Sequence, residues 1–128
     1  MTFTLSDKSK VKLAGVHPDL LRVVNRALAI SKVDFAVTEG LRSAERQAAL
    51  YAAGASQIKS GGRHQTGHAV DLAPIIDGKI AWDWPPFFKI AEAMKAAAAE
   101  LNVPLTWGGD WRSFKDGPHF ELPTKFYP

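Results

Sequence analysis

The chain has 128 residues, a net charge of +3 and a sequence pI near 9.3, and this length predicts a single domain over residues 1–128. It has no cysteine, which excludes disulfides, cysteine-ligated zinc and a cysteine nucleophile. Its basic residues are scattered along the chain and do not predict a nucleic-acid partner. No apolar run approaches the roughly 18 residues that span a bilayer, and Met1–Lys8 lacks the apolar segment of a signal peptide, so we expect synthesis in a cytoplasm and no stable membrane association.

The first half of the chain predicts two helices around a short strand. Pro18 suits the first position of a helix that runs to about Ser31. Its apolar stripe recurs at helical spacing and comprises Leu20, Val24, Ala27 and Leu28. A strand is expected over Phe35–Thr38. Ser43 is a suitable N-cap for a second helix, Ala44–Ala53, which ends at Gly54.

The middle of the chain predicts a loop, a strand and the longest helix. Residues 55–66 are glycine-rich and polar and lead into a strand, His68–Ala73. Asp77-Gly78 between isoleucines is a strong hairpin signal. A helix follows over Pro85–Leu101, with Asp83 as its N-cap and Asn102 at its end. Its predicted buried face comprises Phe88, Ala91, Met94, Ala98 and Leu101.

Two last strands complete the prediction, over Leu105–Trp107 and His119–Leu122. About three helices with four or five short strands joined by hairpins indicate an α+β fold with a mostly antiparallel sheet. In the strand around Asp71, alternation places Val70 and Leu72 on the core side and Asp71 on the opposite face between two alanines. These small neighbours leave room for something to approach the carboxylate.

Two imidazoles and a carboxylate form the main functional pattern. His64 and Asp71 lie in His64-Gln65-Thr66-Gly67-His68-Ala69-Val70-Asp71, and His119 lies in Asp116-Gly117-Pro118-His119. Each of them alone is more often a structural or solvated residue. Together they supply three protein ligands and leave one position for water, which is typical of catalytic zinc. Asp116 is placed to accept the proton of that water. The pattern predicts a metallohydrolase.

The other histidines do not join this pattern. His64 and His68 have the spacing of a helical zinc pair, but Gly61, Gly62 and Gly67 disfavour a helix there. We therefore interpret His68 as a residue that lines the site without binding the metal. His17 precedes Pro18 and is interpreted as a helix-start residue.

These motifs resemble the zinc signature of the M15 peptidases. That group shares its fold with D-Ala-D-Ala carboxypeptidases and dipeptidases and with Hedgehog-type domains. Segments outside the metal motif resemble its phage endolysin branch of L-alanyl-D-glutamate endopeptidases, which cut the stem peptides of peptidoglycan: Gly15–Leu20, Phe35–Arg42 and Trp107–Trp111. The resemblance covers nearly the whole chain.

The resemblance implies a role for each site residue. His64, Asp71 and His119 would bind Zn²⁺, and Asp116 would be the general base. Arg42 would polarise the scissile carbonyl or bind substrate, and Gln47 would contact substrate. Relatives often place a serine two residues before the first histidine ligand, where this chain has Gly62, and Ser60 is left out of the predicted site.

The expected function is therefore a zinc-dependent phage lysin that cleaves the L-alanyl-D-glutamate bond of peptidoglycan stem peptides, acts as a monomer and reaches the wall after release. A D,D- or L,D-carboxypeptidase or dipeptidase of the same fold is the alternative. A wall-binding module with structural zinc would not need Arg42 or Asp116, and both are present. The host and the wall chemotype do not follow from the sequence.

Overall fold

A computed structural model describes residues 3–54, 63–111 and 115–128 of the chain. Its elements in chain order are α1 (Asp7–Lys12), α2 (Pro18–Ile30), β1 (Asp34–Glu39), α3 (Ala44–Ala52), β2 (Ala69–Ile76), β3 (Lys79–Ile80), α4 (Trp84–Leu101), β4 (Thr106–Trp107), the 3-10 helix η1 (Gly108–Asp110) and β5 (His119–Glu121). The α+β class is confirmed. The described residues form four α-helices where about three were expected, because α1 has only six residues and no apolar stripe that would reveal it.

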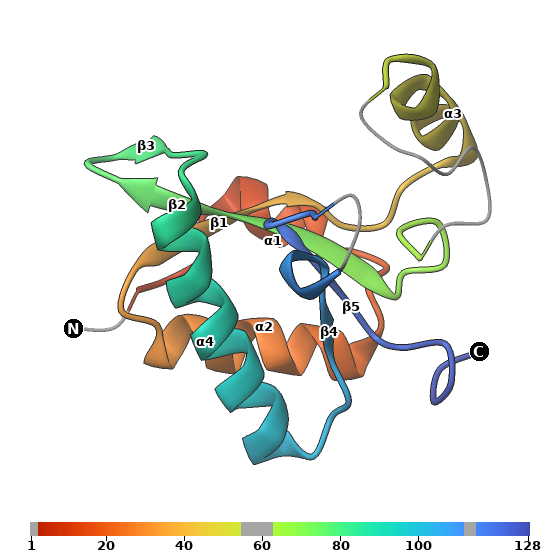
Figure 1. The fold of residues 1–128 in the computed structure, drawn as a ribbon. Coiled ribbons are helices and arrows are strands. Elements are labelled where there is room, and N and C mark those ends of the chain that lie inside the picture. Colours follow the sequence, from red (N-terminus) through yellow and green to blue (C-terminus); the bar gives the residue numbers. More distant parts are fainter. Residues whose placement is uncertain (1–2, 55–62, 112–114) are drawn as a thin grey trace.

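The sheet has the order β1-β2-β5-β4, and all of its pairs are antiparallel. The short strand β3 pairs with the far end of β2. Their connection is the predicted hairpin turn, in which both Asp77 and Gly78 have positive φ as a type I′ turn requires. The central strand β2 thus contacts β1, β3 and β5, and it is the frame on which the site is built (Figure 1).

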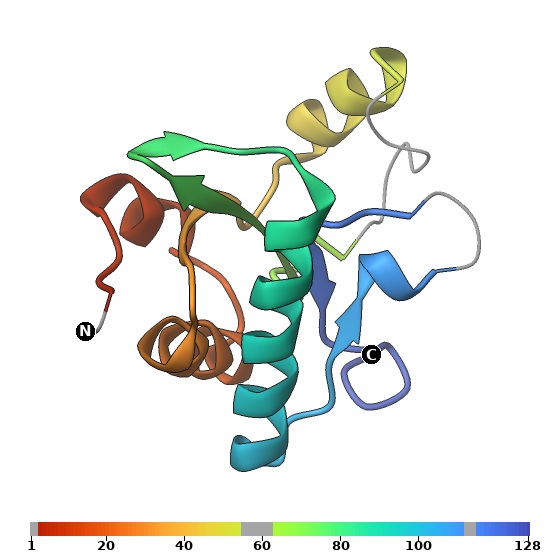
Figure 2. The same cartoon turned by 60° about the vertical axis from the view of Figure 1, so that its left-hand side comes forward.

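The main core lies between the sheet and the helices α2 and α4, which pack against each other (Figures 1 and 2). The sheet contributes Val70, Leu72 and Phe120, all fully buried. The predicted stripe of α2 is buried as expected. The predicted face of α4 is wrong at Phe88, which is 56% exposed, while its neighbour Phe87 is buried. Two consecutive phenylalanines offered two registers, and packing against the sheet selects the first.

The helix ends follow from local capping. Ser43 accepts a hydrogen bond from the Arg46 amide at the start of α3. Asn102 ends α4 in the left-handed conformation. Asp83 occupies the N-cap position of α4, but its side chain makes no capping hydrogen bond.

The helix α3 projects away from the α2–α4 layer (Figures 1 and 2). Within the part of the chain that the structure describes, no helix is long and apolar enough to cross a membrane.

Candidate metal centre

Antiparallel pairing brings the carboxylate of the site to one histidine. Asp71 on β2 is the register partner of His119 on β5, and side chains directly opposite in such a pair lie on the same face. On its other side Asp71 is the register partner of Glu39, after an irregularity in β1. A row of Glu39, Asp71 and His119 therefore crosses three strands.

The second histidine, His64, comes from the turn just before β2. Its carbonyl oxygen accepts a hydrogen bond from the Arg42 amide, 2.9 Å. The neighbouring Arg63 guanidinium donates to the carbonyl oxygens of Leu122 and Tyr127, at 2.7 and 2.6 Å from Nη2. The turn is thus fixed on one side to the segment after β1 and on the other to the C-terminal segment.

Three atoms that could bind a metal ion, one from each of His64, Asp71 and His119, form a nearly equilateral triangle, here called the donor triangle. His64 Nε2 lies 3.2 Å from Asp71 Oδ1 and 3.2 Å from His119 Nδ1, and the third side, His119 Nδ1 to Asp71 Oδ1, is 3.3 Å. Among the described residues this is the one group of three or more His, Asp or Glu side chains able to hold a metal ion. Both histidines are buried.

The outer nitrogens of the two rings fix which nitrogen faces the centre. His64 Nδ1 lies 3.0 Å from the carbonyl oxygen of Gly40, which can only accept, so Nδ1 is the donor. His119 Nε2 lies 2.7 Å from Glu121 Oε1 and donates to that carboxylate. In the neutral rings the lone pairs of His64 Nε2 and His119 Nδ1 then point at Asp71. Three acceptors at this separation repel one another unless a cation or proton lies between them.

The electrostatics of the group agree with this description. Burial alone would raise the pKa of Asp71, but when a proton lies between the groups, hydrogen bonds from His119 and His64 outweigh burial and hold that pKa well below its usual range. Burial alone would lower the pKa of His119, but hydrogen bonds to Asp71 and Glu121 raise it to about 9. The centre therefore favours positive charge.

Asp116 lies in the turn that leads into β5. Its amide donates to the Gly108 carbonyl, 3.0 Å, and its own carbonyl accepts from the His119 amide, 3.2 Å. A Cβ on Gly108 would collide with the Asp116 carbonyl oxygen and approach His119 Cβ at 3.0 Å. Burial, and next the charge of Asp71, raise the pKa of the Asp116 carboxyl. This carboxylate therefore binds a proton more readily than an exposed aspartate.

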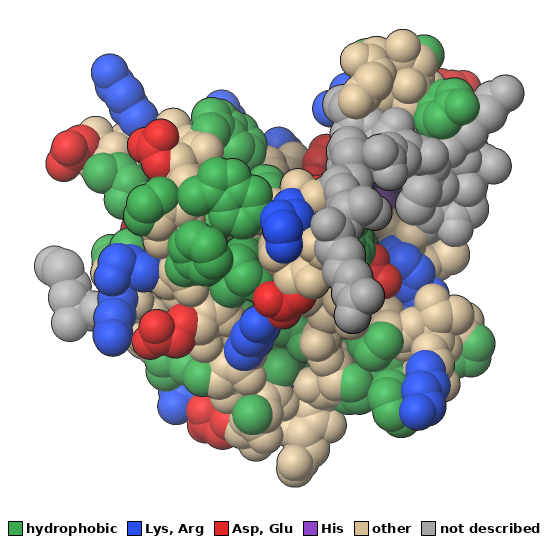
Figure 3. All heavy atoms as spheres, in the orientation of Figure 1, with side chains coloured by type: hydrophobic (Ala, Val, Ile, Leu, Met, Phe, Trp, Pro, Cys, Tyr) green, Lys and Arg blue, Asp and Glu red, His purple; other side chains and the backbone are tan. Residues whose placement is uncertain are grey.

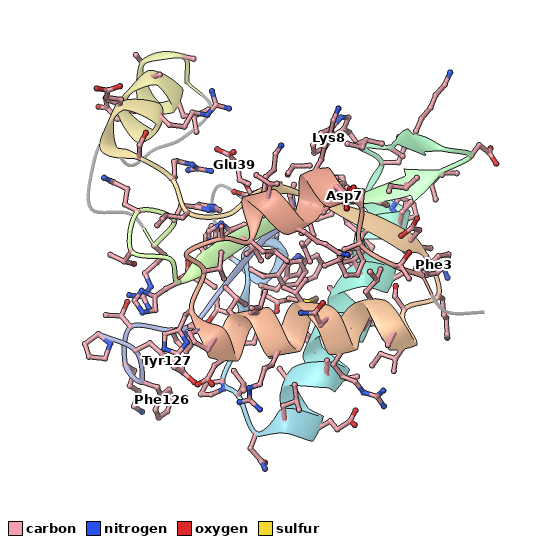
Figure 4. All side chains as sticks on the ribbon, turned by 180° about the vertical axis from the view of Figure 1, so that it is seen from behind. Phe3, Asp7, Lys8, Glu39, Phe126 and Tyr127 are labelled. Atoms are coloured by element: carbon pink, nitrogen blue, oxygen red, sulfur yellow. The ribbon has the colours of Figure 1, made fainter. Side chains whose placement is uncertain are left out.

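Arg42 lies beside the triangle. Its side chain is only 8% exposed, and its Nη2 is 3.5 Å from Asp71 Oδ2. Its Nε donates to Glu39 Oε1 at 3.0 Å, and the same oxygen accepts from Arg46 Nε at 3.3 Å. Figure 4 shows Glu39 between α1 and α3. The backbone of Gln47 lies in α3, whereas its side chain, Ser60 and Gly62 are outside the described residues.

The alanines beside Asp71 differ from the sequence interpretation, whereas the two histidines outside the metal pattern agree with it. The two alanines beside Asp71, Ala69 and Ala73, are fully buried, so the face of β2 that carries the carboxylate is covered rather than open. His68 lies outside the triangle, with its ring centroid 5.5 Å from that of His17 and 6.4 Å from that of Tyr127. His17 is the N-cap of α2, and its Nδ1 accepts from the Asp19 amide, which agrees with its interpretation as a helix-start residue.

Glu39 and Glu121 were not predicted as supporting residues. The strand alternation does place Glu121 on the face of His119, and that was the available signal. Glu39 gave none, because its contact with Arg42 depends on the irregularity in β1. Trp111 was named only as part of a motif, and its ring centroid lies 5.0 Å from that of His119.

Comparison with known proteins identifies the family. Residues 1–126 match the family model described as phage L-alanyl-D-glutamate peptidase. The chain belongs to this family. It is 38% identical to the L-alanyl-D-glutamate peptidase of Escherichia phage T5, in an alignment that covers 95% of this chain and 99% of the phage protein. The resemblance inferred from the motifs is thereby confirmed.

Two solved structures place the fold. The crystal structure of the L-Ala D-Glu endopeptidase ChiX of Serratia marcescens is 46% identical, covers 100% of this chain and 94% of that one, and superposes with a TM-score of 0.91. The vancomycin-resistance D,D-dipeptidase VanXYg is 19% identical over 84% of this chain and 50% of that one, with a TM-score of 0.54. The second likeness concerns the fold alone, and it agrees with the predicted fold class.

Proposed function

We propose that this protein is a zinc-dependent endopeptidase that cleaves the L-alanyl-D-glutamate bond of peptidoglycan stem peptides. The donor triangle of His64, Asp71 and His119 is the observation that carries the proposal. The family membership and the names of the phage T5 and Serratia relatives support the proposal that the L-alanyl-D-glutamate bond is the one cleaved.

The donor set fits zinc. Zinc–nitrogen and zinc–oxygen bonds of about 2.0–2.2 Å in a tetrahedron place neighbouring donors roughly 3.3–3.6 Å apart. The three sides of the triangle measure 3.2, 3.2 and 3.3 Å. An octahedral ion with bonds of about 2.0–2.1 Å would draw them to roughly 3 Å. Three protein donors leave a fourth tetrahedral position for water or substrate.

The residues around the triangle supply the remaining chemistry. Bound zinc would polarise the scissile carbonyl and lower the pKa of a bound water to about 7. Asp116 accepts the proton of the attacking water at its carboxylate, and its raised pKa suits this task. The same carboxyl then returns the proton to the leaving amine. Arg42 brings a buried positive charge beside Asp71 and stabilises the negative charge that develops on the carbonyl oxygen.

The substrate has the matching charge. A stem peptide with D-glutamate next to the scissile bond is acidic, and a guanidinium binds a carboxylate or polarised carbonyl in a defined orientation. Glu39 holds Arg42 through Nε, and Arg42 Nη2 lies 3.5 Å from Asp71 Oδ2, so the guanidinium is positioned beside the proposed metal centre. Gln47 is proposed as a further substrate contact.

Product analysis of purified peptidoglycan tests the proposal. Digestion should release stems that begin with D-glutamate and leave L-alanine on the muramyl chain. A chelator such as phenanthroline should stop the reaction, and Zn²⁺ should restore it. Free D-alanine as the new product would make the protein a carboxypeptidase, and full activity in a demonstrably metal-free sample would exclude the metallopeptidase mechanism.

We also propose where the protein acts. The family contains phage enzymes, and we infer synthesis in the host cytoplasm followed by release onto the wall, with the protein acting as a monomer. Sedimentation equilibrium would test the oligomeric state. Mixing purified protein with intact sacculi would show whether it needs any further component to reach its substrate.

A further inference from the structure

A group of large apolar side chains is exposed on the surface, and one of them, Trp84, packs against the turn that carries Asp116. Four of them, here called the aromatic surface, come from β3 and the segment from there to the start of α4: Ile80 (44% exposed), Trp82 (62%), Trp84 (41%) and Phe88 (56%). Figure 3 shows hydrophobic side chains gathered on this side of the molecule. Exposed patches of this kind mark binding sites more often than scattered apolar residues do.

The rings of the aromatic surface form one packed block and not a set of separate side chains. The ring of Trp84 lies 5.8 Å from that of Phe88 and 6.2 Å from that of the buried Phe87, between centroids. Trp82 packs on Phe87 as well, at 6.3 Å. These rings hold one another in place, so little side-chain freedom would be lost when a ligand binds them.

This block continues into the turn that carries the general base. A Cβ on Gly117 would lie 3.4 Å from ring carbons of Trp84, which places that ring against the residue next to Asp116. Beneath it, Trp107 packs on Phe88 and donates from Nε1 to the Gly117 carbonyl oxygen at 2.7 Å. The aromatic surface therefore begins where the catalytic turn ends.

The proposed cleavage fixes what must lie near that turn. The bond between L-alanine and D-glutamate is one residue from the muramyl sugar, so the sugar lies within roughly 10 Å of the scissile bond, since an extended residue spans about 3.5 Å. The glycan strand is therefore the part of the substrate that must leave the metal centre across a neighbouring surface.

The chemistry of the aromatic surface fits an uncharged sugar chain. The faces of pyranose rings carry C–H bonds with a partial positive charge, and the π-face of an indole is negative. The charged residues interleaved in the same segments are balanced, with Asp77 and Asp83 against Lys79 and Lys89. An anionic lipid surface would need a net basic surface, and this surface does not have one.

We propose that the aromatic surface binds the glycan strand of peptidoglycan, with Trp82 and Trp84 stacking on sugar rings while the attached stem peptide enters the metal centre. The inference rests on the proposed function and deepens it. It assigns the sugar side of the substrate to residues outside the catalytic machinery, and it predicts a preference for stems that still carry their sugars.

Two soluble substrates test the proposal. One is a disaccharide–stem muropeptide, and the other is the same stem peptide with an N-acetyl group on L-alanine, so that both present an acylated alanine. The native enzyme should cut the muropeptide with a kcat/KM about five- to tenfold higher, mainly through KM. Trp82→Ala and Phe88→Ala should each reduce that ratio toward one. Phe126→Ala, an exposed aromatic at the C-terminal segment, should leave the ratio as it is.

The outcomes separate this proposal from the proposed function. Equal kcat/KM on both substrates, or equal losses on both in Trp82→Ala, would overturn glycan binding while leaving the peptidase assignment intact. Failure to cut either substrate would overturn the proposed function itself. Two assays without sugars test other possible partners of this surface, a second copy of the chain and an anionic membrane. If Trp82→Ala abolishes dimerisation in sedimentation, or binding to anionic lipid vesicles, the surface binds that partner and the proposal is wrong.

A peptide-free probe supplies a readout without activity. Addition of tetra-N-acetylchitotetraose should shift the indole N–H resonances of Trp82 and Trp84 in a ¹⁵N-labelled sample, with a smaller effect on the buried Trp107. The absence of any shift at millimolar concentration would contradict the proposal, because the surface is exposed in the free protein.

Discussion

At the scale of single residues, the groups proposed for metal binding and for proton transfer are held by different parts of the chain. His64, Asp71 and His119 supply the donor triangle, whereas Asp116 is held by backbone hydrogen bonds in the turn before β5. We therefore expect the two proposed functions, metal binding and proton transfer, to be removable independently by substitution.

Replacing the base should abolish activity while the metal stays. Asp116→Asn keeps the shape of the side chain and removes its capacity to accept a proton. We expect a 10²–10⁴-fold fall in kcat, with about one zinc per chain measured by atomic emission. Loss of zinc together with activity would make Asp116 a ligand or a determinant of the fold. Unchanged activity would require another base, and Glu121 would be examined next.

Glu121 is instead expected to act through His119. Its carboxylate accepts a hydrogen bond from His119 Nε2 at 2.7 Å. This contact fixes the ring orientation and makes the other ring nitrogen, Nδ1, a stronger metal ligand. Removing such a partner costs about 10–100-fold in metal affinity. Glu121→Gln should therefore weaken zinc binding by this factor in a competition titration with a chelating dye. Glu92→Gln, on the exposed surface, is the matched control and should bind zinc as the native protein does.

At the scale of elements, the sheet and its turns set the geometry of the site. The pairing of β1, β2 and β5 aligns Glu39, Asp71 and His119. The turns before β2 and β5 then bring His64 and Asp116 toward that row. The strands are anchored in the core, and the turns depend on close backbone contacts, so changes in the turns should affect function more than stability.

Gly108 provides a test of this view. A Cβ there would collide with the backbone oxygen of Asp116, whereas a Cβ on Gly117 would meet only ring atoms of Phe87 and Trp84 at 3.3–3.4 Å. Gly108→Ala should displace the catalytic turn and lower kcat/KM at least tenfold, since misplacement by about 1 Å can cost 10²-fold. Gly117→Ala should be milder. Equal activity of the two variants would show that the turn tolerates displacement.

The C-terminal segment returns to the start of α2 and gives a pH-dependent contact. Tyr127 Oη donates to Asp19 Oδ2 at 2.7 Å (Figure 4 labels Tyr127), and this hydrogen bond lowers the pKa of Asp19. A depressed folded-state pKa gives stability that is present above the unfolded pKa and is lost as the pH falls through the folded value. Tyr127→Phe should therefore lower the free energy of unfolding at pH 7, by less than about 1 kcal/mol because the pair is partly exposed. Urea titrations should show the difference shrinking between pH 5 and pH 3.

At the scale of the whole molecule, the sequence predicted what local patterns determine. The grouping of His64, Asp71 and His119 was predicted because their spacing forms a joint motif. The helices α2 and α4 were predicted because their apolar residues repeat. Glu39 was missed because its contact with Arg42 exists only in the folded sheet. The exposure of Phe88 was missed because periodicity alone does not choose between neighbouring phenylalanines. The roles of Arg42, Asp116 and Gln47 stay predictions that substitution can test.

Metal binding should also stabilise the whole chain, because the triangle joins β2, β5 and the turn before β2. A ligand that binds only the folded state adds RT ln(1 + [L]/Kd), about 4 kcal/mol when free zinc exceeds its Kd a thousandfold. For a domain of this size that corresponds to a rise in Tm on the order of 10 °C. His119→Ala should remove the zinc-dependent part and leave a folded protein, since Phe120 and Leu122 remain fully buried. Calorimetry of the native protein and the variant, each with and without zinc, measures the Tm of each protein and how much zinc raises it. A variant whose Tm still rises with zinc as the native protein's does would remove His119 from the metal centre.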